Sequence, residues 1–155
     1  SDSFKPLYNE GMSLVEEAAE YLDGKGRAEA KKLSRMAATL YAAESMRLTT
    51  RLMQVASWLL LQRAANSGEM TREQVAAEKA KVRLDTASAA EQAEGWHDLP
   101  EAFRDLVNRS LSLQNLVRRM DDQVYGAAST FAQPPRRSNP VSDQITLLHT
   151  AFGGV

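Results

Sequence analysis

Residues 41–63 constrain the fold more than any other part of the chain. The stretch contains neither glycine nor proline, and on a helix at about 100° per residue it separates into two faces. The apolar face covers roughly half of the circumference. Its members are Met46, Leu48, Leu52, Met53, Val55, Ala56, Leu59 and Leu60. A stripe this wide predicts a long helix that packs against two or more others.

The opposite face of the same helix carries Glu44, Arg47, Arg51, Gln54 and Trp58. Its three charged residues are spaced by three and four, so they can form a self-paired ladder. One interpretation is a solvated ladder, since exposed pairs of this kind are common and weak. The other is a partner-binding patch, because Trp and Arg are enriched at interface hot spots. We favour binding for Arg47, Arg51 and Gln54 and expect Trp58 to be partly buried; a buried pair at Arg51 would place the face against another helix.

Composition narrows the class of protein. The 155 residues fit one domain, and the formal net charge of −1 gives no signal for nucleic acid or an anionic membrane. There is no cysteine, which excludes disulfides and thiolate metal sites and agrees with a cytoplasmic location. No signal peptide is expected, and the longest dense apolar run is too short to span a bilayer. Helix-forming residues dominate and no segment alternates with period two, so the predicted class is all-α.

The sequence predicts three long helices, over residues 7–22, 27–66 and 98–125, the second with a possible kink near 39–43. A capping box at Thr71 predicts a weaker fourth helix to about residue 93. Asp98 is the expected N-cap of the last helix, with Pro100 in its first turn.

The last helix has heptad spacing, with one polar member, Ser110. The positions are Leu99, Phe103, Leu106, Ser110, Leu113, Val117, Met120 and Val124. Further apolar residues flank this seam at Val107, Leu111 and Leu116. They predict a homodimer that is buried through the last helix or the long second helix.

The chain divides into a predicted bundle over residues 1–125 and a disordered tail over residues 126–155, whose first part, residues 126–143, is rich in Ala, Ser and Pro. A short apolar segment at 144–152 interrupts the tail. Its anchors are Ile145, Leu147, Leu148 and Phe152. The segment either folds back, stays disordered, or serves as a peptide motif for a partner.

No motif for catalysis, cofactor or metal binding is apparent. The two histidines, His97 and His149, have no ligand partners at helical spacing, and no nucleotide-binding fingerprint occurs. The best enzyme candidate is the cluster at residues 44, 47, 51 and 54, which could bind a small dicarboxylate if it faced inward. We expect a non-enzyme.

The residues at 44–54, 58–64 and 68–70 resemble one known family. They are similar to RcdA, the regulator of CtrA degradation. The match is dense over residues 41–72 and looser over 7–22 and 98–125. The resemblance implies a three-long-helix bundle, often dimeric, with a flexible C-terminal tail and no enzymatic activity.

The resemblance also implies a function and partners. It points to an adaptor that helps to deliver substrates such as CtrA and TacA to the ClpX unfoldase and the ClpP peptidase. The implied partners are the response regulator CpdR, docked on ClpX, and the effector PopA. The alternatives from other classes are the small-molecule enzyme above and a purely structural dimerisation module.

Overall fold

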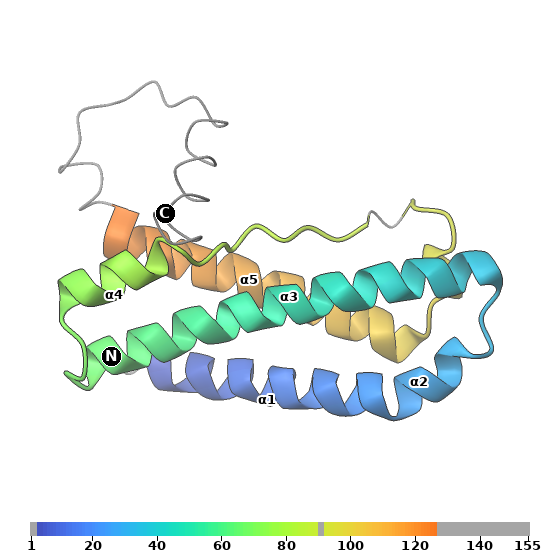
Figure 1. The fold of residues 1–155 in the computed structure, drawn as a ribbon, viewed down its shortest axis with the longest axis horizontal. Helices are drawn as coiled ribbons and strands as arrows, with labels where there is room; N and C mark the ends of the chain where they lie inside the picture. The colour runs from blue at the N-terminus through green and yellow to red at the C-terminus, as the bar shows by residue number, and fades with distance from the viewer. Residues whose placement is uncertain (1–2, 90–91, 127–155) are drawn as a thin grey trace, which may run out of the picture.

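The computed structural model describes residues 3–89 and 92–126. These residues form helices and no strand, which confirms the all-α class. Three long helices pack against one another: α1 (Phe4–Asp23), α3 (Arg35–Asn66) and α5 (Glu101–Asp121) (Figure 1). Beyond Gly126 the predicted tail, with Ile145, Leu147, Leu148 and Phe152, lies outside the described residues.

The helix predicted over 27–66 is two helices in the structure, α2 (Lys25–Ala30) and α3. The break precedes Arg35 and lies before the expected kink at 39–43. Ser34 provides the local reason. Its backbone is extended, and its hydroxyl accepts a hydrogen bond from Ala37 N at 3.2 Å, so it caps α3 and starts the helix anew.

The predicted fourth helix is much shorter than expected. The capping box is present, with Thr71 and Gln74 each accepting from the other's backbone N–H, but α4 (Arg72–Lys79) ends long before residue 93. Residues 80–89, which we call the strap, are not helical. They bind the bundle through polar contacts described below, so tertiary contacts override the helix propensity of the alanines.

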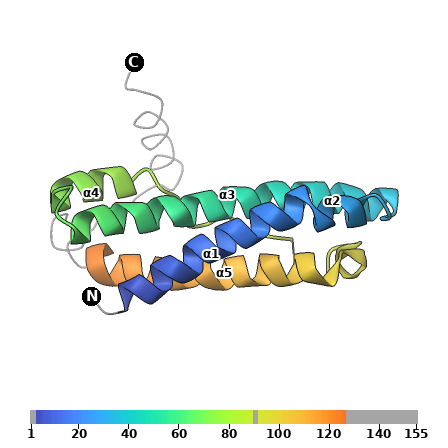
Figure 2. The same ribbon diagram turned by 90° about the horizontal axis from the view of Figure 1, so that it is seen from below.

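The direction of the helices explains why a strap is needed. Figure 1 shows that α3 and α5 run in the same direction and that the chain between them returns along the bundle. In Figure 2, α1 crosses both helices obliquely, and it contacts both. Two parallel neighbours cannot be joined by a tight turn, so the return segment must span nearly their full length.

The seam of α5 lies in the core as predicted from Leu99 through Val117, but Met120 is only half-buried and Val124, beyond the end of α5, is 37% exposed. The aromatic rings of Phe103 and Tyr41 meet there, with centroids 4.5 Å apart. The start of α5 differs from the prediction. Asp98 belongs to the short helix η1 (Trp96–Asp98), and Pro100 stands at the N-cap position. After α5 the described chain ends in a short π-helix, η2 (Asp122–Gly126).

Candidate functional site

The face of α3 with the predicted partner-binding residues is largely buried within the chain. Glu44 and Arg51 are 0% exposed and Trp58 is 1% exposed. Glu44 and Arg51 therefore do not lie on a surface patch, and Trp58, which was expected to be partly buried, is almost fully buried. Arg47 is exposed and Gln54 is half-buried, so a partner could still reach these two.

Three residues from the predicted apolar face are exposed instead. Met46 is 72% exposed, Met53 61% and Leu60 51%, so their expected burial is wrong. The reason is geometric, because the buried positions of α3 follow heptad spacing irrespective of residue type. These heptad positions are Ala37, Tyr41, Glu44, Leu48, Arg51, Val55 and Trp58, and Leu52 and Leu59 are buried beside them. A prediction that divides the helix into buried and exposed faces by residue polarity therefore fails where polar residues occupy the seam.

Arg51 joins three elements. Its Nη1 donates to Ser110 Oγ on α5 at 2.7 Å, and its Nη2 donates to Ser88 Oγ on the strap at 2.8 Å. Its Nε donates to the carbonyl oxygen of Thr86 at 3.1 Å. Ser110, the one polar member of the α5 seam, thus meets the charged member of the α3 seam in a buried polar layer.

Glu44 holds the next part of the strap. Its Oε1 accepts from the backbone N–H of Ala89 at 2.9 Å and from Arg47 Nη1 at 2.6 Å. Burial alone would raise the pKa of Glu44. The hydrogen bonds from Ala89, Ser88 and Arg47 outweigh burial and hold that pKa below its ordinary value. Glu44 is therefore a buried carboxylate kept ionised by its surroundings.

Trp58 anchors α4 and the end of α5. Its indole Nε1 donates to Asp121 Oδ1 at 2.8 Å, and Lys79 Nζ lies 4.0 Å from the centroid of its ring. Lys79 is only 8% exposed, and burial lowers its pKa to about 8, although Asp121 acts in the opposite direction. The tryptophan is thus a structural residue of the bundle, and no sequence pattern had pointed to its lysine partner.

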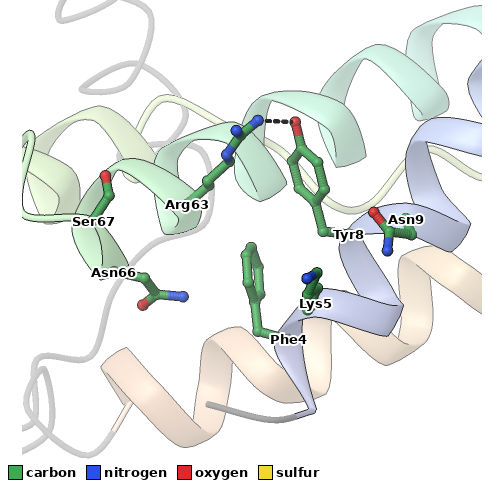
Figure 3. Close-up of a pocket in the computed structure, with 7 residues that line it drawn as sticks. All are labelled: Phe4, Lys5, Tyr8, Asn9, Arg63, Asn66 and Ser67. Carbon is green, nitrogen blue, oxygen red and sulfur yellow. Dashed lines mark hydrogen bonds between the residues drawn. The ribbon is translucent and has the colours of Figure 1, made fainter.

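A second feature is a surface pocket of about 370 Å³ between the start of α1 and the end of α3 (Figure 3). It is lined by Phe4, Lys5, Tyr8, Asn9, Arg63, Asn66 and Ser67. Arg63 Nη1 donates to the Tyr8 hydroxyl at 2.8 Å, and its guanidinium carbon lies 5.1 Å from the centre of that ring. The pocket combines aromatic and cationic groups, and no sequence pattern pointed to it.

Two kinds of site are absent from the residues that the structure describes. No group of three or more His, Cys, Asp or Glu side chains there could hold a metal ion. None of the helices in this part of the chain has the length and apolarity needed to cross a bilayer.

The fold and the buried polar layer define the class: an all-α bundle of three long helices with a strap between the last two. The family described as "Protein of unknown function (DUF1465)" matches residues 1–152, and the chain belongs to this family. The fold is similar to the crystal structure of RcdA from Caulobacter crescentus CB15, with 50% sequence identity and a TM-score of 0.66. That match covers 79% of this chain and 91% of the RcdA chain, which confirms the resemblance seen in the sequence. No curated protein matches the chain.

Proposed function

We propose that the chain is a non-enzymatic, cytoplasmic adaptor that helps to deliver cell-cycle regulators such as CtrA and TacA to the ClpXP protease. The observation that carries the proposal is the 50% identity with RcdA over 91% of that chain. By the same relationship, its partners are ClpX and ClpP through CpdR, and PopA.

The buried polar layer supports a non-enzyme. The catalytic alternative needs Glu44, Arg47, Arg51 and Gln54 to face a substrate. Instead, the three donor nitrogens of Arg51 bond Ser110, Ser88 and the strap carbonyl, and Glu44 bonds Arg47 and the strap. The polar groups of Glu44 and Arg51 are therefore bonded within the chain, to the strap, to Arg47 and to α5.

Two regions are candidates for partner contact. On α3, the exposed Arg47 and half-buried Gln54 remain from the predicted patch. In the tail, the anchors are Ile145, Leu147, Leu148 and Phe152, the only large apolar side chains of residues 144–152.

A reconstituted degradation assay tests the adaptor proposal. Purified ClpX, ClpP, CpdR and PopA would be given CtrA with and without this protein, and we expect faster loss of CtrA when it is present. The Arg47→Ala variant should lose part of the stimulation, whereas Arg118→Ala, an exposed arginine on α5, should keep it. Loss of CtrA at the same rate without the protein would refute delivery.

Truncation tests the tail separately. A chain without residues 126–155 should keep its helicity and melting temperature, because few of the removed residues could join the core. Its stimulation of CtrA degradation should fall. Full stimulation by the truncated chain would show that the tail is dispensable for that substrate.

We also propose that the chain is a homodimer, paired through α3. Met46, Met53 and Leu60 are exposed and spaced by seven, and between them lie only uncharged residues on the same side, such as Thr50 and Ser57. The stripe is symmetric about Met53. A twofold axis there would pair Met53 with its copy and Met46 with the Leu60 of the second chain, which makes a self-complementary contact.

A further inference from the structure

The strap is held in an unusual way for a connecting segment. The backbone of the strap and the hydroxyl groups of Thr86 and Ser88 form hydrogen bonds with side chains of α3 and α5. Its apolar residues, Val82 and Leu84, are only half-buried. These two side chains pack against the hydrophobic core at the start of the strap, whereas residues 86–89 are held by hydrogen bonds from the bundle.

Thr86 is the centre of these contacts. Gln114 on α5 makes a paired contact with its main chain, accepting from Thr86 N and donating to Thr86 O, both at 3.2 Å. The same carbonyl accepts from Arg51, and the Thr86 hydroxyl donates to Gln54 Oε1 at 2.8 Å. A side-chain amide that bonds both the N–H and the C=O of one residue recognises backbone and not side-chain identity.

The spacing of the bundle groups fits an extended peptide. The strap is bonded at Thr86 and at Ala89, which are three residues or about 10 Å apart in an extended chain. The matching groups on α3, Arg51 and Glu44, are seven residues or about 10 Å apart on a helix. One heptad of α3 thus matches three residues of peptide.

The buried charges also depend on this segment. Arg51 directs two of its three bonding nitrogens to the strap, and Glu44 accepts from the strap N–H of Ala89. Buried charges are costly without such partners. Any segment that replaced the strap would have to offer a carbonyl, an N–H and a small or hydroxyl side chain in the same places.

We infer that the groove between α3 and α5 is a binding site for an extended peptide, and that the strap is its internal occupant. The partner is an extended protein segment with Thr or Ser at the positions of Thr86 and Ser88 and small residues beside them. The strap competes with it from within the chain, at an effective concentration in the millimolar range. The inference does not depend on the adaptor role.

The test uses a labelled synthetic peptide with the sequence of residues 82–89, titrated into the full chain. In the Thr86→Pro variant the strap loses the N–H that binds Gln114, so the peptide should bind at least about tenfold more tightly than to the wild type. Ala87→Pro is the matched control, because the Ala87 N–H takes no part in the hydrogen bonds described above. This variant should bind the peptide as the wild type does. Adding Gln114→Ala to Thr86→Pro should abolish the gain.

Two results would overturn the inference. One is a folded Thr86→Pro chain that binds the peptide no better than the wild type. The other is equal binding of a peptide that itself carries proline at the Thr86 position. If Thr86→Pro does not fold, amide hydrogen exchange of the wild-type protein with and without the peptide tests the inference instead. Excess peptide should then speed exchange at Thr86 and Ala89, and unchanged exchange at both would equally overturn the inference.

Discussion

Arg51 and Ser110 show how two polar residues in apolar seams can specify one arrangement of helices. Each occupies a heptad position that would ordinarily hold an apolar side chain, and their hydrogen bond joins α3 to α5 at one register. A shift of either helix by one turn would leave a buried guanidinium without its partner, which costs several kcal/mol. The pair therefore selects the register of the bundle.

Replacing Arg51 by alanine should cost about 2–4 kcal/mol of unfolding free energy, because Ser110, Ser88 and the strap lose a buried charged donor together. Arg47→Ala should cost at most about 1 kcal/mol, since its side chain is 47% exposed and Glu44 keeps the bond from Ala89. Urea unfolding of the two variants measures the difference. Equal losses would mean that the buried contacts of Arg51 contribute little.

Lys79 gives the stability a specific pH dependence. In the folded chain the pKa of Lys79 is about 8, whereas its ordinary value is 10.5. Between pH 8 and pH 10.5, unfolding is therefore accompanied by the uptake of a proton at Lys79. Raising the pH therefore favours the folded state, by about 1–2 kcal/mol between pH 7.5 and 9.5. The stabilisation does not continue above about pH 10, because burial raises the pKa of Tyr21 and Tyr41 in the folded chain. The unfolded chain then loses these phenol protons first, so the stability falls as the pH rises further.

Chemical denaturation at several pH values checks this slope. The Lys79→Met variant is the control, because it keeps an unbranched apolar stem over Trp58 without the titrating amine. Its stability should be flat over the same window. A wild-type stability that falls from pH 7.5 to 9.5 would contradict the lowered pKa.

At the scale of the helices, the sequence predicted the three long elements and the α5 seam because heptad spacing in apolar residues is a local signal. The seam of α3 was missed because Glu44, Arg51 and Trp58 have the composition of a surface. Ser110 was the available hint, since a polar residue in one seam calls for a polar partner in another. The strap could not be predicted, because alanine-rich residues favour helix locally and only contacts with Gln114, Arg51 and Glu44 make them extended.

The contact of α1 with α3 depends on Gly11, where the two helices approach closely. A side chain there would overlap the Leu59 side chain, which is 0% exposed. We expect Gly11→Val to cost about 1–3 kcal/mol through overpacking. Ala19→Val, on the exposed side of α1, should cost only the helix propensity, within about 0.7 kcal/mol. Thermal melts of the pair compare them, and similar melting temperatures would show that the core yields at Gly11.

At the scale of the whole molecule, the parallel course of α3 and α5 determines which surfaces stay free. The strap and α1 both lie against these two helices, and they cover the seam of α3. On α3, the large apolar side chains that stay exposed are Met36, Met46, Met53 and Leu60, and Arg47 is exposed as well. On α5, Leu116 is 40% exposed and offers the competing apolar surface from the sequence prediction.

Two matched substitutions decide between these helices as the dimer interface. Met53→Glu places two carboxylates together on the proposed twofold axis, so it should convert the dimer to a monomer at tens of micromolar in sedimentation. Leu116→Glu introduces the same charge on α5 and should leave the dimer intact. Dissociation by Leu116→Glu alone would move the interface to α5, and a wild-type monomer at that concentration would refute the homodimer. Both substituted positions are exposed, so unchanged helicity in each variant would show that any dissociation reflects the interface and not the fold.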